Sequence, residues 1–411
     1  KMKNFFKTLV ILVLILTSSF IIRHSSVMAS ERFFDLQSID TMKYSRDTAR
    51  NKSVTKEIPN FVKAAATLNP THIAISTPYD EEFYPVLKIW VSEARKHKLK
   101  VWFRGNFSSW EGWFDYPKFE NPNDHNWKTS TFIQNHPDLF EDGDIFTPVP
   151  EPENGGFGDP RRGEDIKQKF FAFLPESYQT CKVSFEIIGK DVRCGYFSVN
   201  GDVAKLFTKE MVKQTGGVLV IDHYVKTAKQ LKEDIIKYHE TVQAPIILGE
   251  YGTPIPDIHG DLSEQAQADL IYDNMKELVK IRTITKGINY WTAFGGSTSL
   301  FGKNFAPRKA VGVIAEYYKP KQLKFFVKNW RNTPLKDVSI KVTNLESNEI
   351  TDINGRADVL TIKDYKIIHI EKEGYRSRYF FVDDKNSKDL IHVTLDEKRP
   401  GIFDFLKRLF I

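Results

Sequence analysis

The sequence predicts an α/β fold, a TIM (β/α)8 barrel followed by a small all-β sandwich domain. Eight short apolar runs recur at intervals of roughly thirty residues between residues 31 and 318, with amphipathic helical patterns between them, as repeated βαβ units require. The runs are continuously apolar rather than alternating, which is typical of parallel strands covered on both faces. After Pro320 the pattern changes to short β-runs separated by turn residues, which indicates a second domain.

The barrel is expected over residues 30–319, a length that suits eight βα units. Its predicted strands are Phe33–Ile39, His72–Ser76, Leu99–Phe103, Asp144–Val149, Cys194–Val199, Gly217–Ile221, Ile246–Leu248 and Gly287–Trp291. A helix after the second strand is indicated by Val86, Ile89, Trp90 and Ala94, which recur at helical spacing. The long interval Ser108–Asp142 is expected to form an extended loop over the mouth of the barrel.

The sandwich is expected over residues 320–398. Its predicted strands are Leu323–Val327, Val338–Val342, Tyr365–Ile370, Tyr379–Val382 and Leu390–Thr394. Three segments, Thr333–Val338, Thr351–Arg356 and Lys372–Tyr375, resemble the carboxypeptidase regulatory-like (transthyretin-like) sandwiches. That resemblance implies a module that binds or spaces rather than one that catalyses.

The two ends of the sequence indicate export and a surface contact. Residues 1–29 read as a signal peptide, with lysines at the start, the apolar run Leu9–Leu16, and small residues that place cleavage after Ala29. Secretion or display at the cell surface follows, and an uncleaved anchor stays open because Phe5–Ile22 nearly spans a bilayer. The C-terminal amphipathic tail, 399–411, is apolar and basic, so it can touch a membrane surface or dock on the sandwich.

Composition excludes several classes of protein. The net charge of +6 is spread along the chain without a basic, aromatic block, so no nucleic-acid partner is expected. The histidines have no ligand spacing, so no metal and no cofactor are expected, and His72, His97, His125 and His136 are interpreted as structural. Cys181 and Cys194 are the only cysteines; a disulfide would suit an exported protein, but buried free thiols are the expectation.

Two glutamates carry the functional prediction. Glu151 and Glu250 each follow an apolar run at the point where a Gly/Pro-rich loop begins, and they lie 99 positions apart (250 − 151). That spacing is about three βα units, which places them after strands 4 and 7, at the same end of the barrel. Paired carboxylates facing each other are what a glycosidase needs. We assign Glu151, between two prolines, as acid/base with Glu153 as its rival, and Glu250 as nucleophile.

At these positions the chain resembles the clan A glycoside hydrolases, close to the family 5 cellulase-like enzymes. The resemblance rests on Pro-Glu151-Pro, Gly-Glu250-Tyr and Tyr-Trp291. It implies an acid/base glutamate after strand 4, a nucleophile after strand 7 and a sugar-stacking Trp291 after strand 8. Pro150 stands where the family has an asparagine that grips a sugar hydroxyl. The residues that can replace that contact are Asn154, Asn106 and Asn200.

Further residues are predicted to bind the substrate. Arg104 follows the third strand and is expected to hold Glu250 ionised. Asp222 and Tyr224 lie two apart after the sixth strand and share a face, so Tyr224 is expected to hydrogen-bond Glu250. The aromatic-rich segment that follows Asn106 supplies Trp110 and Trp113 as candidate stacking platforms for sugar rings.

The sequence therefore predicts a secreted retaining glycoside hydrolase that cleaves β-glycosidic bonds in a polysaccharide or oligosaccharide. Its partner is a carbohydrate, with the cell envelope or a membrane surface as a second contact. One alternative is a non-catalytic carbohydrate-binding cell-surface protein on a barrel scaffold, which is motivated by Pro150 and the appended sandwich. A weaker alternative is a barrel hydrolase that acts on another kind of bond.

Overall fold

The computed structural model describes residues 31–343, 345, 347–363, 367–382 and 390–398. Its main feature is a nine-stranded sheet in the order β5-β4-β3-β2-β1-β9-β8-β7-β6, in which every pairing is parallel. The two end strands, β5 and β6, are separated in the chain only by Gly195, Tyr196 and Phe197. The sheet therefore curls back on itself, and the predicted TIM-like barrel followed by a β domain is confirmed.

The strands lie close to the predicted runs. They are β1 Leu36–Asp40, β2 His72–Ile75, β3 Lys100–Phe103, β4 Ile145–Phe146, β5 Arg193–Cys194, β6 Ser198–Asn200, β7 Leu219–Asp222, β8 Ile246–Tyr251 and β9 Thr285–Tyr290. The run predicted as one strand, Cys194–Val199, forms two short strands instead. Gly195 and Tyr196 both have positive φ angles, which no strand can accommodate, so the chain turns between β5 and β6.

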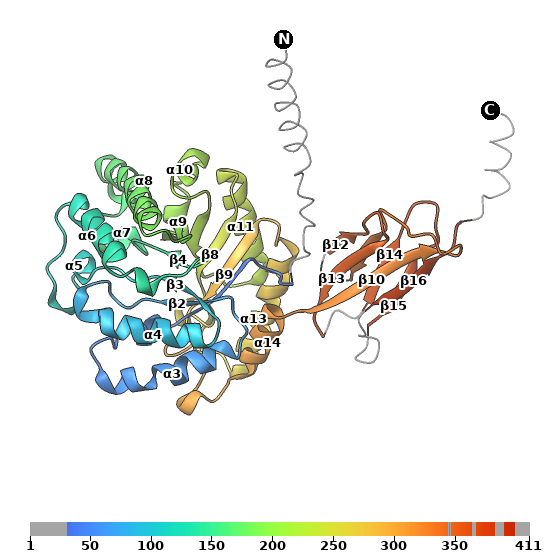
Figure 1. Cartoon of the computed structure of the whole chain (residues 1–411), viewed down its shortest axis with the longest axis horizontal. Coiled ribbons are helices and arrows are strands. Elements are labelled where there is room, and N and C mark those ends of the chain that lie inside the picture. The colour runs from blue at the N-terminus through green and yellow to red at the C-terminus, as the bar shows by residue number, and fades with distance from the viewer. Residues whose placement is uncertain (1–30, 344, 346, 364–366, 383–389, 399–411) are drawn as a thin grey trace, which may run out of the picture. The chain divides into compact units, whose positions relative to one another are not determined.

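Helices cover the outside of the parallel strands (Figure 1). The α-helices are α2 Met42–Ser45, α3 Lys52–Ala66, α4 Tyr84–Lys96, α5 Ser108–Glu111, α6 Pro122–Asn135, α7 Pro152–Gly155, α8 Glu164–Ile187, α9 Gly201–Ala204, α10 Lys209–Gln214, α11 Ala228–Val242, α12 Pro256–His259, α13 Glu264–Lys280 and α14 Lys309–Tyr318. Short 3₁₀ helices are η1 Glu81–Phe83, η2 Trp113–Asp115, η3 Pro137–Leu139, η4 Pro160–Arg162 and η5 Lys303–Phe305.

The interval Ser108–Asp142 is not the extended loop that was expected, because it contains α5, η2, α6 and η3. The start of α6 carries signals that identify a helix. The Asn121 side chain accepts from the backbone N–H of Asn123, and Pro122 occupies the first helical position. The helix was missed because its apolar face is weak, with Phe132 and Ile133 buried only near its end.

The interior of the barrel has an apolar layer beneath a polar one. Leu36, Ala74, Trp102, Ile145, Tyr196, Val220 and Ile247 form a buried cluster of their own, separate from the core between strands and helices. Side chains two residues apart on a strand share a face, so the next inward positions toward the carboxyl ends lie directly above this layer. Those positions include the charged residues Arg104 and Asp222, which belong to a buried polar cluster at this end of the barrel.

Cys181 of α8 and Cys194 of β5 form a disulfide, with Cα atoms 6.0 Å apart. The expectation of buried free thiols is wrong. The reason is that α8 runs back along the barrel and leads through a short connection into β5, which brings the two Cα atoms within bonding range. Neither cysteine side chain faces solvent.

The chain after α14 forms two sheets. Their strands are β10 Lys321–Asn329, β11 Ser339–Val342, β12 Ser347–Ile350, β13 Arg356–Thr361, β14 Ile367–Glu371, β15 Arg378–Phe381 and β16 Ile391–Leu395. One sheet has the order β13-β10-β16 and the other β12-β11-β14-β15. The prediction missed β12 and β13, whose sequences are too polar to read as buried strands. The regulatory-like identity of this β domain stays a prediction.

Alternating burial organises the β domain. Leu323, Phe325 and Val327 of β10 are buried, while the residues between them are more exposed. The ring of Phe325 lies 6.1 Å from that of Phe380 in the other sheet, so the two sheets share a core.

Two predicted segments, the signal peptide at 1–29 and the tail at 399–411, lie outside the described residues. Within the ranges that are described, none of the helices is both long and apolar enough to span a membrane.

Candidate active site

Arg104 is the centre of a buried polar cluster at the carboxyl ends of the barrel strands. It directly follows β3 and is 1% exposed. Its Nη1 donates to Asp40 Oδ2 at 2.8 Å and to Glu250 Oε1 at 3.2 Å. Its Nη2 donates to Ser198 Oγ at 2.9 Å and lies 3.7 Å from Asp222 Oδ1. One cation therefore serves three carboxyl groups that come from β1, β7 and β8.

Strand alternation explains why these side chains meet. Trp102 of β3 belongs to the apolar layer inside the barrel, and Arg104 lies two positions further on, so it points to the same side. Val220 and Asp222 of β7 repeat this relation. On each of these strands, the inward residue before the polar side chain is packed in the apolar layer, and this packing fixes the position of the polar side chain.

Asp40 completes the cluster at the end of β1. Its Oδ1 accepts from the backbone N–H of Met42 at 2.7 Å, and its Oδ2 accepts from Asn289 Nδ2 at 2.9 Å. Asn289 Nδ2 also donates to the backbone oxygen of Gly249 at 2.8 Å. Neither Asp40 nor Asn289 was among the predicted site residues. The sequence does contain a signal for Asp40: it directly follows the first apolar run, just as the predicted site residues follow theirs.

A β-bulge turns Glu250 into the site. β7 and β8 pair in register up to Ile221 with Leu248, and the next pair is Asp222 with Glu250, so β8 carries Gly249 as an extra residue. Without the bulge Glu250 would share the outward face of Leu248, which packs in the core under the helices. Gly249 has no room for a side chain, since an added Cβ would lie 2.7 Å from Asp222 Oδ1.

Two donors hold the Glu250 carboxyl group. Arg104 binds Oε1, and the Tyr224 hydroxyl donates to Oε2 at 2.9 Å, as predicted for that tyrosine. Burial raises the pKa of Glu250 to about 7; the charges of Glu151 and Asp40 also raise it, while Arg104 and Tyr224 lower it. Glu250 and Glu151 are therefore close enough for their charges to interact, although they come from opposite sides of the barrel.

Asp222 has a different environment. Among the described residues, neither of its carboxyl oxygens has a hydrogen-bond partner, and the side chain is buried. Burial raises its pKa well above the ordinary value, and the charge of Glu250 raises it further, against the attraction of Arg104. Glu250 has two hydrogen-bond donors and Asp222 has none among the described residues, so hydrogen bonding favours ionisation of Glu250 over that of Asp222.

Glu151 stands at the start of α7 in a left-handed conformation, with φ +44°. Its backbone N–H donates to the oxygen of Ser198 at 2.9 Å, and its Oε1 accepts from Asn154 Nδ2 at 3.0 Å. Burial raises the pKa of Glu151, and the charges of Glu153 and Glu111 raise it further, while Arg104 lowers it. A carboxyl group in this setting tends to keep its proton.

Glu153, the rival acid/base residue, is tied to the framework. It is 5% exposed, and its Oε1 accepts from the backbone N–H of Asn200 at 2.6 Å. Burial raises its pKa, and the contacts with Asn200 lower it. This link joins α7 to the end of β6, so the geometry favours Glu151 as the group that is free to meet a ligand.

Asn106 and Trp110 lie deeper than expected. Asn106 Oδ1 accepts from the backbone N–H of Phe107 at 2.8 Å and bonds His125 Nε2 at 2.9 Å, while its Nδ2 has no partner among the described residues. Trp110 is 1% exposed and stacks on Phe173 with ring centres 5.3 Å apart. The prediction of Trp110 as a sugar platform is corrected, because its ring faces lie within an aromatic cluster rather than toward solvent.

Trp113 and Trp291 remain accessible platforms. Trp113 is 38% exposed, with the Arg46 guanidinium 4.2 Å from its ring centre. The Trp291 ring lies 6.1 Å from that of Tyr224 in an edge-to-face arrangement, which places it beside the Glu250 donor. The structure thus brings Arg104, Asp222, Tyr224, Glu250 and Trp291 together.

The residues that sequence reasoning missed are Asp40, Ser198, Asn289 and Glu111. Across the described ranges no group of three or more His, Cys, Asp or Glu side chains is arranged to hold a metal ion.

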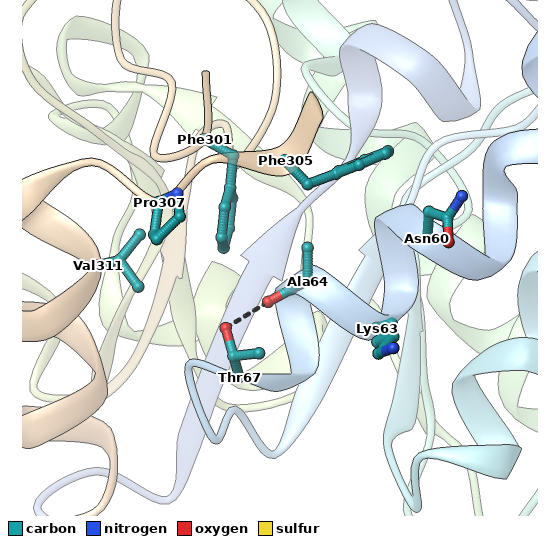
Figure 2. Close-up of a pocket in the computed structure, with 8 residues that line it drawn as sticks. All are labelled: Asn60, Lys63, Ala64, Thr67, Phe301, Phe305, Pro307 and Val311. Atoms are coloured by element: carbon teal, nitrogen blue, oxygen red, sulfur yellow. Dashed lines mark hydrogen bonds between the residues drawn. The ribbon is translucent and has the colours of Figure 1, made fainter. Parts of the chain in front are cut away.

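A separate pocket of about 480 Å³ lies on the outside of the barrel, against α3 (Figure 2). Phe301, Phe305 and Val311 form its apolar side, and Asn60 and Lys63 of α3 border it. None of the candidate catalytic residues lines this pocket.

Comparison with known proteins identifies the fold. No model of a known protein family matches the chain, and no curated protein sequence matches it. Among solved structures, GH5_18 from Streptomyces cattleya in complex with GlcNAc has a TM-score of 0.53 at 12% identity, covering 73% of this chain and 85% of that chain. A GH5_18 variant from Bifidobacterium longum subsp. longum ATCC 55813 in complex with Manb1-4GlcNAc has a TM-score of 0.52 at 13% identity, with coverages of 73% and 84%. These structural neighbours are glycoside hydrolases, and at such identity the likeness concerns the fold alone.

Proposed function

We propose that this protein is a retaining glycoside hydrolase that cleaves β-glycosidic bonds in a polysaccharide or oligosaccharide. The observation that carries the proposal is the setting of Glu250: a bulged strand turns its carboxyl group into the barrel mouth, Arg104 and Tyr224 donate to it, and the charge of Glu151 acts on it. A fixed carboxylate opposite a second carboxyl group with a raised pKa is the arrangement that double displacement needs.

In the first step the Glu250 carboxylate attacks the anomeric carbon of the bound sugar and forms a glycosyl ester. Glu151 gives its proton to the departing glycosidic oxygen as that bond breaks. In the second step Glu151, now ionised, takes a proton from water. The water oxygen then attacks the anomeric carbon and releases Glu250, so the product keeps the β configuration.

Hydrogen bonds and neighbouring charges support these protonation states, while burial raises the pKa of both Glu250 and Glu151 and so opposes the ionised form of Glu250. Arg104 and the Tyr224 hydroxyl stabilise the ionised form of Glu250. Asp222 lies 3.7 Å from Arg104 but has no hydrogen-bond donor among the described residues, so it is proposed to hold a proton. The Glu151 carboxyl group is partly buried and sits among other carboxyl groups, which favours its acidic form.

We propose that Asn106 replaces the asparagine that the glycoside hydrolase family has at the position of Pro150. That asparagine would contact a sugar hydroxyl. Of the three candidates, Asn154 already donates to Glu151, and Asn200 is engaged with Glu153. Asn106 alone keeps an amide Nδ2 without a partner among the described residues, and because that atom is buried, the proposal requires the Asn106 side chain to move before it can donate to a sugar hydroxyl. Trp291 and Trp113 are proposed as stacking surfaces for the sugar rings.

We also infer that the protein is exported and meets its carbohydrate outside the cytoplasm, in the medium or the cell envelope. The signal-like pattern of residues 1–29 motivates this inference. The Cys181–Cys194 disulfide supports it, because such bonds persist in oxidising compartments. Detection of a mature chain that starts after Ala29 in a culture medium or envelope fraction would test it.

The direct test is turnover on a panel of aryl β-glycosides and soluble polysaccharides, followed by proton NMR of the first product formed. The proposal requires hydrolysis that yields the β anomer initially. An α product would indicate an inverting enzyme. Sugar binding without any turnover would instead favour the non-catalytic carbohydrate-binding alternative.

A further inference from the structure

The outer face of one sheet in the β domain displays aromatic rings that the core does not use. Tyr379 and Phe381 of β15 are 66% and 64% exposed. Between them Phe380 points the other way and lies against Phe325 in the domain core. The exposure of Tyr379 and Phe381 is therefore not caused by a shift in the register of β15. The inward-facing side chain of this strand, Phe380, already packs in the domain core.

Pairing register defines this outer face. Lys341 of β11 pairs with Asn348 of β12 on one side and with His369 of β14 on the other, and His369 pairs with Tyr379. These four side chains thus form one row across the sheet. In the next row Ile367 pairs with Phe381. We call Ile367, His369, Tyr379 and Phe381 the aromatic platform.

Ring stacking and strand pairing hold the aromatic platform in place. The rings of His369 and Tyr379 stack with centres 4.6 Å apart and planes 23° from parallel. Both residues lie within paired strands, so neither ring depends on a loop for its position. A stacked pair fixes the plane of the Tyr379 ring before any ligand arrives, which lowers the entropy lost on binding.

Beside the aromatic platform the same face is polar. Lys341 Nζ donates to Glu371 Oε1, and Ser339 Oγ donates to Asn348 Oδ1. The charges of Lys341 and Glu371 offset each other, so this part of the face attracts neither anions nor cations strongly. It still presents an ammonium, a carboxylate and an amide that can bond hydroxyl groups.

The exposed area argues against a second copy of the chain as the occupant. Two aromatic side chains about two-thirds exposed offer roughly 200–330 Å² of surface. A stable interface needs about 800 Å² on each partner. A small planar ligand with an apolar face and a polar rim matches this surface better than a protein does.

We propose that the aromatic platform is a binding site for a neutral β-linked polysaccharide, whose sugar rings stack on Tyr379 and Phe381 while their hydroxyls bond the adjacent polar side chains. The site goes beyond the proposed hydrolase activity, and only the choice of a β-linked polymer rests on that proposed function. It would hold the chain on an insoluble carbohydrate whether or not the barrel cleaves it.

The test is a pull-down of the full-length protein with amorphous cellulose, β-mannan and chitin at low temperature, comparing wild type with Tyr379→Ala/Phe381→Ala. We expect wild type to sediment with at least one polymer, and the double variant to bind it at least about tenfold more weakly, or ~1.4 kcal/mol. Trp330→Ala is the matched control, since Trp330 is 59% exposed in the same domain but lies after β10, away from the aromatic platform. Circular dichroism checks that each variant stays folded.

Three results would overturn the proposal. They are failure of wild type to bind any of the three polymers, equal binding by the double variant, and an equal loss in Trp330→Ala. Gel filtration with light scattering compares the oligomeric states of the two proteins. A dimeric wild type and a monomeric double variant would identify a second copy of the chain as the occupant and overturn the proposal. Hydrolysis of a soluble aryl glycoside should be unchanged in the double variant, which keeps this site distinct from the barrel.

Discussion

The two sides of the barrel mouth hold their glutamates in opposite ways. On the β8 side, Glu250 belongs to a regular strand with one bulge and receives hydrogen bonds from Arg104 and Tyr224. On the β4 side, Glu151 follows only a two-residue strand, sits in a left-handed turn between two prolines, and bonds a single amide from Asn154.

This difference teaches how one site can surround two carboxyl groups with contacts that favour opposite protonation states. A buried carboxylate needs cations and donors, and the strand side supplies them through Arg104. The loop side supplies burial and other carboxyl groups, which favour the neutral acid. Substitutions at Glu250, Glu151, Tyr224 and Asp222 each remove one element of this contrast.

The largest effect is expected for Glu250→Gln. The amide cannot form a glycosyl ester, so kcat should fall by at least about 10⁴-fold, the order of loss seen when a covalent nucleophile is removed. Steady-state hydrolysis of an aryl β-glycoside measures it. Glu233→Gln, on the exposed face of α11, is the matched control. Activity of Glu250→Gln within tenfold of wild type would refute the role of Glu250 as the nucleophile.

A smaller effect is expected for Glu151→Gln, and it should depend on the leaving group. Loss of a general acid lowers kcat/KM by about 10²–10⁴-fold for an oligosaccharide, whose departing oxygen needs a proton. A nitrophenyl glycoside, whose leaving group departs unprotonated, should react far better. Glu153→Gln is the rival to compare. If Glu153→Gln shows the leaving-group dependence and Glu151→Gln does not, the two assignments must be exchanged.

Tyr224→Phe removes one donor from the strand side. Glu250 must be ionised to attack, and its pKa of about 7 means that the rate falls as pH drops below neutrality. Loss of a hydrogen bond to the carboxylate should move this acid limb of kcat/KM upward by about 1–2 pH units. Tyr238→Phe, which loses a bond to the oxygen of Gly201, is the control. A limb that stays in place would show that Tyr224 does not stabilise the ionised form.

The smallest effect on rate is expected for Asp222→Asn. If Asp222 holds a proton, the amide is its neutral mimic, and kcat/KM at pH 7 should stay within about threefold, ~0.7 kcal/mol. Stability should respond instead. Because folding raises the pKa of Asp222, its contribution to stability is present at acid pH and is lost as pH rises toward the folded pKa.

Thermal melts from pH 4 to pH 9 measure the second part of this prediction. Asp222→Asn should match wild type at acid pH and become progressively more stable than wild type as the pH rises. A variant that is less stable than wild type at high pH would mean that Asp222 is ionised beside Arg104, and the division of charges would need revision.

The sequence was informative for residues whose place in the fold follows from the nearest apolar strand run alone. Arg104, Asp222 and Glu250 could be found because each follows an apolar run, and strands of a parallel barrel end at the same edge. The same rule points to Asp40, which was overlooked. The bulge at Gly249 could not be read from the sequence, since it appears only when β8 is paired with β7.

Residues whose role depends on packing between distant segments were harder to predict. The sequence predicts Trp110 as a surface platform, but Trp110 is enclosed by Phe157 and Phe173 and lies so close to Gly156 that no side chain fits at that glycine. The disulfide needed the path of α8 relative to β5. Neither relation leaves a periodic signal in the sequence.

Covalent trapping tests the central claim most directly. The wild-type protein is incubated with a slow fluorosugar substrate that carries a good leaving group, and mass spectrometry then locates the label in the digested chain. A retaining mechanism predicts one sugar per chain, attached to the peptide that contains Glu250, and no label in Glu250→Gln. Hydrolysis that proceeds without a trapped sugar, or a label on any other residue, would contradict it.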